Sequence, residues 1–278
     1  MKSCPPSACS RCPAAAPEGL QRHGVRMDRW DYVVALAGNP NTGKSTLFNA
    51  LTGLRQHTGN WPGKTIARAE GGFSYGDKRY KLVDLPGTYS LLSASPDEEI
   101  ARDFILFGQP HVTVVVVDAT RLERNLNLVL QVLQITNRVV VCTNLIDEAR
   151  TRGLTLDTRG LARDLGVPVV PTAARQGEGV GDLLRAIAEV ADGRTRCRPR
   201  KLTCDVPGFS RAVHEMVSTL EKAFPGVRHA QWIATRLLEG DKRIAEAVAS
   251  GELHALMEST EEDSRTGLPV EAATGAPS

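Results

Sequence analysis

Residues 38–45 constrain the fold of this chain more than any other segment. Their sequence, GNPNTGKS, fits the pattern G-x-x-x-x-G-K-S. An apolar run precedes the pattern at residues 32–37 and a helical pattern begins within it at Lys44, which is the context that a phosphate-binding loop requires. Glycines let such a loop wrap phosphate groups, helix amides point at them, Lys44 neutralises their charge and Ser45 offers a hydroxyl to Mg²⁺. We therefore expect nucleotide contacts from Gly38, Asn39, Pro40, Asn41, Thr42, Gly43, Lys44, Ser45 and Thr46.

Strand and helix patterns alternate after this loop. Strands are expected at residues 32–37, 66–73, 80–84, 112–118, 138–143 and 167–170, and helices at 44–52, 97–107, 122–135, near 161, and at 180–191. Such alternation predicts a six-stranded, mostly parallel α/β sheet covered by helices on both faces. Only a turn-like segment, residues 74–78, separates the second and third strands, so these two should be antiparallel neighbours.

Composition divides the chain into further segments. We predict a disordered Cys- and Pro-rich leader at residues 1–30, a nucleotide-binding domain at 31–192 and a basic linker at 193–204. A small helical domain should follow at 205–258, and a disordered acidic tail at 259–278.

Charge and hydropathy exclude several classes of protein. The formal net charge of this 278-residue chain is +2, too small to indicate a nucleic-acid partner. The longest apolar runs are strand-sized, below the roughly 18 residues of a membrane helix. The amino-terminal residues lack the apolar stretch of a secretory signal, so we expect a cytoplasmic protein with no transmembrane segment.

Two further segments indicate Mg²⁺ and γ-phosphate contacts. Asp84 ends a predicted strand, where it can hold Mg²⁺ through water, and the Gly87 amide can sense a γ-phosphate. Thr65 lies between the first helix and the second strand, where it can close over the nucleotide and complete the Mg²⁺ shell. Neither segment would be specific without the phosphate loop.

The base should be guanine. Asn144 and Asp147 follow the apolar strand at residues 139–143, and a carboxylate accepts hydrogen bonds from guanine's ring N–H and amine but is repelled by adenine. The plainer alternative for Asp147 is a helix N-cap. After the last predicted strand come Thr172, Ala173 and Ala174, where a backbone amide would reach the guanine carbonyl.

These motifs together resemble the cytosolic GTPase domain of the FeoB ferrous-iron transporter family over residues 31–192. The resemblance is carried by GNPNTGKST, GNWPGKT, DLPGTYSL, SPDEEIARDFIL, VVDATRLERNLNL, TNLIDEA and ARQGEG. It implies a Ras-like P-loop GTPase fold, followed by a shortened form of that family's helical domain around Gln231–Asp241.

The resemblance also implies a mechanism. In K⁺-activated members of this class, an asparagine at the position of Asn41 coordinates K⁺, with carbonyls at the positions of Gly59 and Trp61. Lys44, Asn41, Thr65 and Gly87 would then be the catalytic residues. Thr88 stands where Ras-like proteins have a water-positioning glutamine, so hydrolysis should be slow without K⁺.

Departures from the pattern bear on affinity and transport. Leu145 replaces the lysine of most GTPases, which predicts weak affinity and quick exchange, and Ala173 replaces a common serine. Lys64 adds a positive charge beside Thr65. The family's membrane domain does not follow in this sequence, so we expect no iron transport by this chain alone and a separate permease or small iron-uptake accessory protein as its partner, which could hold it at the inner face of the membrane.

Cysteines in the leader have ligand-like spacing. Cys4, Cys9 and Cys12, with His23 as a fourth ligand, could form a zinc or iron–sulfur site, but the flanking sequence lacks a core to organise them, so we expect no bound metal there. His57 is expected to face solvent.

The leading hypothesis is a GTPase that needs Mg²⁺ and K⁺ and supports ferrous-iron uptake. One alternative is a module that senses GTP or GDP without hydrolysing it, and another is an Era-type GTPase that associates with ribosomes or RNA. The Era-type alternative predicts an RNA-binding domain, which the segment after Lys201 does not resemble.

Overall fold

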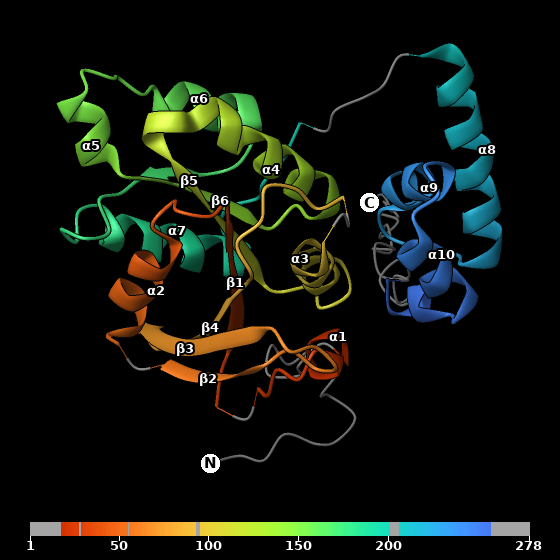
Figure 1. Ribbon diagram of the computed structural model, residues 1–278, viewed down its shortest axis with the longest axis horizontal. Coiled ribbons are helices and arrows are strands. Elements are labelled where there is room, and N and C mark those ends of the chain that lie inside the picture. Colours follow the sequence, from red (N-terminus) through yellow and green to blue (C-terminus); the bar gives the residue numbers. More distant parts are fainter. Residues whose placement is uncertain (1–17, 28, 55, 93–94, 201–205, 257–278) are drawn as a thin grey trace, which may run out of the picture. The chain divides into compact units, whose positions relative to one another are not determined.

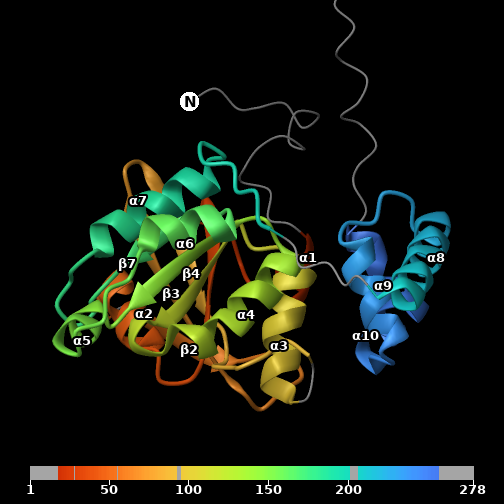
Figure 2. The same ribbon diagram turned by 90° about the horizontal axis from the view of Figure 1, so that it is seen from above.

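A computed structural model describes residues 18–27, 29–54, 56–92, 95–200 and 206–256 (Figure 1). The chain divides into two compact units between Cys204 and Asp205. The first unit is an α/β sandwich and the second is helical (Figures 1 and 2).

A seven-stranded sheet forms the centre of the first unit, in the order β2-β3-β4-β1-β5-β6-β7. Its strands are β1 (Tyr32–Gly38), β2 (Gln56–Asn60), β3 (Ala67–Tyr75), β4 (Lys78–Asp84), β5 (Val112–Asp118), β6 (Val139–Asn144) and β7 (Val169–Pro171). Strands β4, β1, β5, β6 and β7 pair in parallel. The α/β class and the mostly parallel sheet are confirmed, and β3 pairs antiparallel with β4, as the short turn at residues 76–77 predicts.

The prediction of six strands is wrong by one strand. The additional strand is β2, which pairs antiparallel with β3 at the edge of the sheet. Its sequence, QHTGN, carries no apolar alternation, because its described side chains from His57 to Asn60 are exposed and its pairing is made by the backbone alone. His57, expected to face solvent, is exposed on this strand.

Helices cover both faces of the sheet (Figure 2). On one face α2 (Lys44–Thr52) and α7 (Val180–Ala191) share a core with alternate strand residues such as Val34 and Leu36. The other helices of this layer structure are α3 (Pro96–Leu106), α4 (Leu122–Ile135), α5 (Ile146–Thr151) and α6 (Thr158–Leu165), with the short turn η2 (Ala119–Arg121) before α4. Ser95 caps α3 by accepting a hydrogen bond from the Glu98 amide at 3.3 Å, and proline follows it at the first helical position.

The prediction of a disordered leader is wrong for residues 18–27. These residues form α1 (Glu18–Arg22) and a following extended segment, in which Leu20 and Val25 are almost fully buried. Arg68 of β3 donates to the His23 carbonyl at 2.6 Å, and Lys81 of β4 donates to the Arg26 carbonyl at 3.1 Å. The segment therefore belongs to the first unit.

The second unit consists of α8 (Pro207–Ala223), α9 (Ala230–Leu238), α10 (Lys242–Ala249) and the turn η3 (Glu252–Leu256). Its core holds Val213, Leu220, Phe224, Ile233, Ala234, Ile244, Ala247, Leu253 and Leu256. A small helical domain in this part of the chain agrees with the sequence expectation, and its expected end at residue 258 and the acidic tail lie outside the described residues.

Candidate functional site

The phosphate loop connects β1 to α2 at the centre of the sheet. Gly43, the last residue before α2, has φ +77°, a conformation that favours glycine. A Cβ atom at Gly43 would lie 2.3 Å from the side-chain amide nitrogen of Asn144. Any larger residue at this position would therefore collide with the neighbouring strand end.

Lys44 and Asp84, both predicted site residues, are in direct contact. The Lys44 ammonium lies 2.5 Å from Asp84 Oδ1 and donates to the Leu85 carbonyl at 2.7 Å. The pairing of Leu36 with Asp84 brings the ends of β1 and β4 to the same edge of the sheet. Burial raises the pKa of Asp84, and the Lys44 charge opposes that rise. Ser45, the next residue, is exposed at the start of α2.

The turn after Asp84 is attached to the phosphate loop. The Thr88 amide donates to the Gly38 carbonyl at 3.2 Å, and a Cβ at Gly87 would contact Pro40 at 3.5 Å. Thr88 is buried, and its hydroxyl donates to the Ser90 carbonyl at 2.7 Å. The Gly87 amide therefore lies beside the phosphate loop, while the Thr88 side chain is engaged within its own turn.

Asn144, at the end of β6, joins three segments that the sequence assigns to nucleotide binding. Its side-chain nitrogen donates to the Thr42 carbonyl at 2.9 Å. Its side-chain oxygen accepts from the Thr172 hydroxyl at 3.2 Å and from the Ala174 amide at 3.0 Å. Asn144 is 1% exposed, so these hydrogen bonds are shielded from water. The phosphate loop and the segment after β7 are thereby held in a fixed relation.

Asp147 lies in the first turn of α5 and has an unexpected partner. Gln176 donates to Asp147 Oδ2 at 2.9 Å. Ala173, which is buried, pairs with Glu178 across a short bridge, and this places Gln176 at the tip of the segment after β7. Gln176 lies within the ARQGEG motif, but its role as the partner of Asp147 could not be predicted from the sequence, because the two residues are 29 positions apart. Leu145, between Asn144 and α5, has φ +61°, and its side chain approaches the Cβ position of Gly43 at 3.9 Å.

The segment expected to close over the nucleotide is partly a strand. Gly59 lies in β2 opposite Arg68, and Trp61 follows that strand. The Trp61 ring is buried, 5.4 Å from both the Phe104 ring and the Arg68 guanidinium, and its carbonyl accepts from the Lys64 amide at 3.0 Å. Among the described residues, no hydrogen bond joins Asn41 to Gly59 or Trp61.

Thr65 is exposed in the turn between β2 and β3, and Asn41 is exposed with φ +64°. The register of β2, β3 and β4 places this turn at the same end of the sheet as Asp84. Strand β3, which follows the turn, lies two strands away from β1, the strand that leads into the phosphate loop. The neighbouring Lys64 forms an ion pair with Glu99 of α3 at 3.5 Å.

Cys4, Cys9 and Cys12 lie outside the described residues. The ring of His23, named as their fourth ligand, lies edge-on to Phe104 at 5.7 Å. In the part of the chain that the structure describes, no three His, Cys, Asp or Glu residues form a cluster suited to a metal ion.

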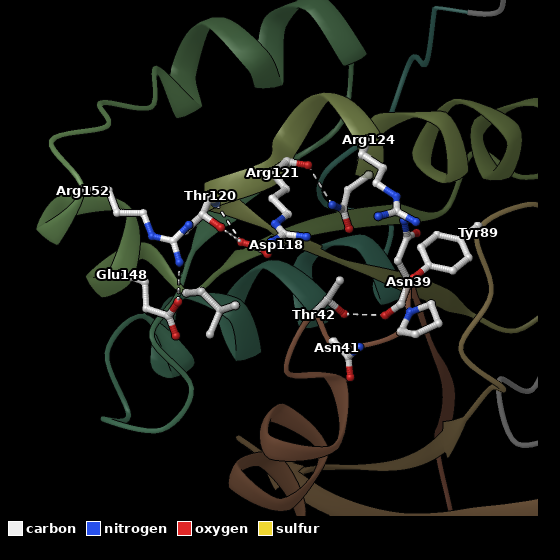
Figure 3. Close-up of a pocket in the computed structure, with 13 residues that line it drawn as sticks. Asn39, Asn41, Thr42, Tyr89, Asp118, Thr120, Arg121, Arg124, Glu148 and Arg152 are labelled. Atoms are coloured by element: carbon white, nitrogen blue, oxygen red, sulfur yellow. Dashed lines mark hydrogen bonds and ion pairs between the residues drawn. The ribbon is translucent and has the colours of Figure 1, made fainter.

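A pocket of about 360 Å³ lies on the flank of the phosphate loop (Figure 3). Sequence reasoning missed it, because its walls come from four separate segments of the chain. The lining residues are Asn39, Pro40, Asn41, Thr42, Tyr89, Asp118, Thr120, Arg121, Arg124, Asn125, Leu145, Glu148 and Arg152.

A family model described as ferrous iron transport protein B matches residues 32–187. The chain belongs to the FeoB family. It is 38% identical over 215 residues to the Fe(2+) transporter FeoB of Escherichia coli K12, an alignment that covers 75% of this chain and 27% of that protein. The chain thus spans about a quarter of the length of the curated relatives that it matches.

Solved FeoB cytosolic domains share this fold. The cytosolic domain of T. maritima FeoB in its apo form is 36% identical, with a TM-score of 0.72, over 83% of this chain and 89% of that one. For the cytosolic domain of L. pneumophila FeoB the identity is 33% and the TM-score 0.68, over 81% and 95% of the two chains. In the part of this FeoB-family chain that the structure describes, no helix is long and apolar enough to cross a bilayer.

Proposed function

We propose that this chain binds GTP and GDP and hydrolyses GTP to GDP and phosphate. The observation that carries the proposal is the hydrogen-bonding of Asn144, which joins the phosphate loop at Thr42 to the segment after β7 at Ala174. One buried side chain thereby couples the loop suited to phosphates with the segments suited to guanine. The T. maritima cytosolic domain, 35–36% identical to this chain, has been solved in GDP and GMPPNP forms.

Guanine selectivity is assigned to Asp147. Its carboxylate lies at the start of α5 and can accept hydrogen bonds from the guanine ring N–H and amine. Gln176 holds one carboxylate oxygen and thereby fixes its orientation. Thr172, Ala173 and Ala174 are buried beside Asn144, and their amides donate to Thr143, Glu178 and Asn144, so an amide of this segment would have to exchange its partner to reach the guanine carbonyl.

The donor set fits a hard cation such as Mg²⁺. Ser45 offers a hydroxyl, and Asp84 offers a carboxylate at the adjoining strand end. Thr65 would complete the set from its exposed turn. Mg²⁺ when bound would neutralise phosphate charge. Lys44, whose ammonium already lies at this strand end, would bind phosphate, and the Gly87 amide would donate to the γ-phosphate.

K⁺ is assigned to Asn41, with the carbonyls of Gly59 and Trp61. The exposed Asn41 side chain stands on the phosphate loop and offers an amide oxygen, a ligand type suited to such a cation. The cation would supply positive charge beside the phosphates. Thr88 occupies the place of a water-positioning glutamine and is hydrogen-bonded to Ser90, which supports slow hydrolysis without the cation.

The biological role follows from the family. We propose that the chain acts in the cytoplasm, in support of ferrous-iron uptake, through a membrane permease or a small iron-uptake accessory protein. A non-hydrolysing GTP/GDP sensor is the second candidate, favoured by the engagement of Thr88 within its own turn. The match to a FeoB model over residues 32–187 argues against an Era-type GTPase.

GTP turnover in Mg²⁺ with K⁺, compared with Mg²⁺ and Na⁺, tests the proposal. We expect stimulation by K⁺ that disappears in Asn41→Ala, and no turnover of ATP. GTP binding without turnover in either salt would leave the sensor as the function.

A further inference from the structure

The pocket beside the phosphate loop shares residues 39–42 with that loop but does not include the residues assigned to Mg²⁺ and to the guanine ring. Lys44, Asp84 and Asp147 are not among its lining residues. Its walls are residues 39–42 of the loop, Tyr89 of the turn after β4, the end of β5 with η2 and the start of α4, and residues 145–152 in and around α5 (Figure 3). A molecule in this pocket would therefore touch the loop from its flank.

Two buried asparagines in the wall have side-chain atoms without hydrogen-bond partners. Asn39 is 2% exposed, and neither its nitrogen nor its oxygen has a hydrogen-bond partner. Asn125 is 3% exposed; its nitrogen donates to the Arg121 carbonyl at 2.8 Å, but its oxygen has no partner. Buried polar atoms in proteins are nearly always paired with protein groups or ordered water, so these unpaired amide atoms make the wall behind the pocket polar.

The charge balance of the pocket favours an anion. Both carboxylates are engaged: Glu148 with Arg152 at 3.7 Å, and Asp118 with the amide and hydroxyl of Thr120, both at 2.7 Å.

Within the described residues, Arg121 and Arg124 have no carboxylate partner. Arg124 lies over the Tyr89 ring at 4.5 Å from its centroid, as Figure 3 shows, which orients its guanidinium. The planar donor fork of arginine matches phosphate oxygens.

The size of the pocket indicates what carries the anion. Small-molecule sites generally measure roughly 300–1,000 Å³, and 360 Å³ lies at the lower end of that range. We propose that this pocket binds the phosphate group of a small phosphorylated molecule, with Arg121 and Arg124 holding the phosphate. Because Asn41 and Leu145 also line the pocket, its occupancy would alter nucleotide affinity.

Calorimetric titration of the full chain with saturating Mg²⁺ and GDP tests this assignment, since GDP occupies the phosphate loop. The probes are inorganic phosphate and ribose 5-phosphate. The test variant is the double substitution Arg121→Gln and Arg124→Gln, and the matched control is Arg163→Gln, an arginine of α6 whose side chain is 78% exposed and outside the pocket. Circular dichroism and thermal unfolding establish that each variant is folded.

We expect ribose 5-phosphate to bind the parent chain and Arg163→Gln equally, and the double variant at least tenfold more weakly. Equal weakening for inorganic phosphate would identify the free ion as a second source of the same group. Binding of neither probe, or equal binding by the double variant, would overturn the proposal. If GDP itself does not bind, the proposed GTPase function fails, while the titration without GDP still reports on Arg121 and Arg124.

Discussion

Asn144→Ala should destabilise the first unit even without nucleotide. The substitution removes three buried hydrogen bonds, to Thr42, Thr172 and Ala174. At a net contribution of about 1 kcal/mol for each bond, the expected loss in the free energy of unfolding is about 3 kcal/mol. For a domain of this size that loss corresponds to a fall in Tm of roughly 6–12 °C. The substitution would also leave the Thr42 carbonyl and the Ala174 amide unpaired. Water that enters the vacated space can pair with these groups, so the extent of its entry decides where between roughly 6 and 12 °C the fall in Tm lies.

The assay is urea unfolding followed by circular dichroism, with thermal scans of the same samples. Asn137→Ala is the matched control, since Asn137 is exposed in the loop between α4 and β6. A loss below about 1 kcal/mol, or one equal to that of Asn137→Ala, would refute the argument that Asn144 holds the nucleotide-binding segments together. An unchanged m-value would show that the variant changes stability and not the two-state transition.

Three further predictions concern other parts of the chain. Asp147→Asn should weaken GTP binding at least tenfold and improve binding of xanthosine triphosphate, whose ring carbonyl matches the new amide; fluorescence titration with both nucleotides measures this, and unchanged preference would contradict the role of Asp147. Leu20→Ala should cost about 2–5 kcal/mol of unfolding free energy, because this side chain of α1 is fully buried; a loss no larger than that of the exposed Leu54→Ala would show that α1 does not belong to the folded unit. Burial lowers the pKa of His111 from 6.5 to about 4, and its ring nitrogen accepts from the Val33 amide, so the fold favours the neutral ring. Unfolded His111 takes up a proton below about pH 6.5, whereas the folded ring does so only near pH 4. The free energy of unfolding of the parent chain should therefore decrease by about 3 kcal/mol as the pH is lowered from about 6.5 to about 4. The His111→Asn variant should lose this part of the pH dependence in urea unfolding, and a pH profile identical to that of the parent chain would contradict the role of His111.

The strands and helices of the first unit could largely be predicted from local pattern. The buried strands are continuous apolar runs, and α2 and α4 begin and end at the predicted residues because apolar periodicity marks them. The edge strand β2 could not be predicted in this way. Its residues are ordered by pairing with the backbone of β3, and its own side-chain pattern carries no signal of that pairing.

The ordered segment after residue 17 was missed for a related reason. Leu20 and Val25 are isolated apolar residues with no period, and their burial depends on a surface that distant segments provide. Arg68 and Lys81 reach its carbonyls from β3 and β4, 45 and 55 residues further along the chain. A local pattern carries no information about contacts of that range.

Some residues of the candidate site could be predicted from local sequence motifs, and others were brought together only by the fold. Motif spacing predicted the phosphate loop, Asp84, Asn144 and Asp147 as site residues, because each chemical role requires particular residue types directly after a strand, and the parallel topology brings those strand ends to one end of the sheet. Gln176 as the partner of Asp147 and the pocket beside Asn39 followed only from the fold.

The sequence by itself determined the phosphate-loop motif, a carboxylate suited to guanine, the α/β class and the resemblance to FeoB. These are properties of residue type and short spacing, which the chain carries before it folds. Tertiary structure alone decided which polar groups are buried together and which remain unpaired, because burial and hydrogen-bond partnership depend on atoms that are far apart in the chain. The contact of Lys44 with Asp84 and the orphaned amides of Asn39 and Asn125 are results of that second kind.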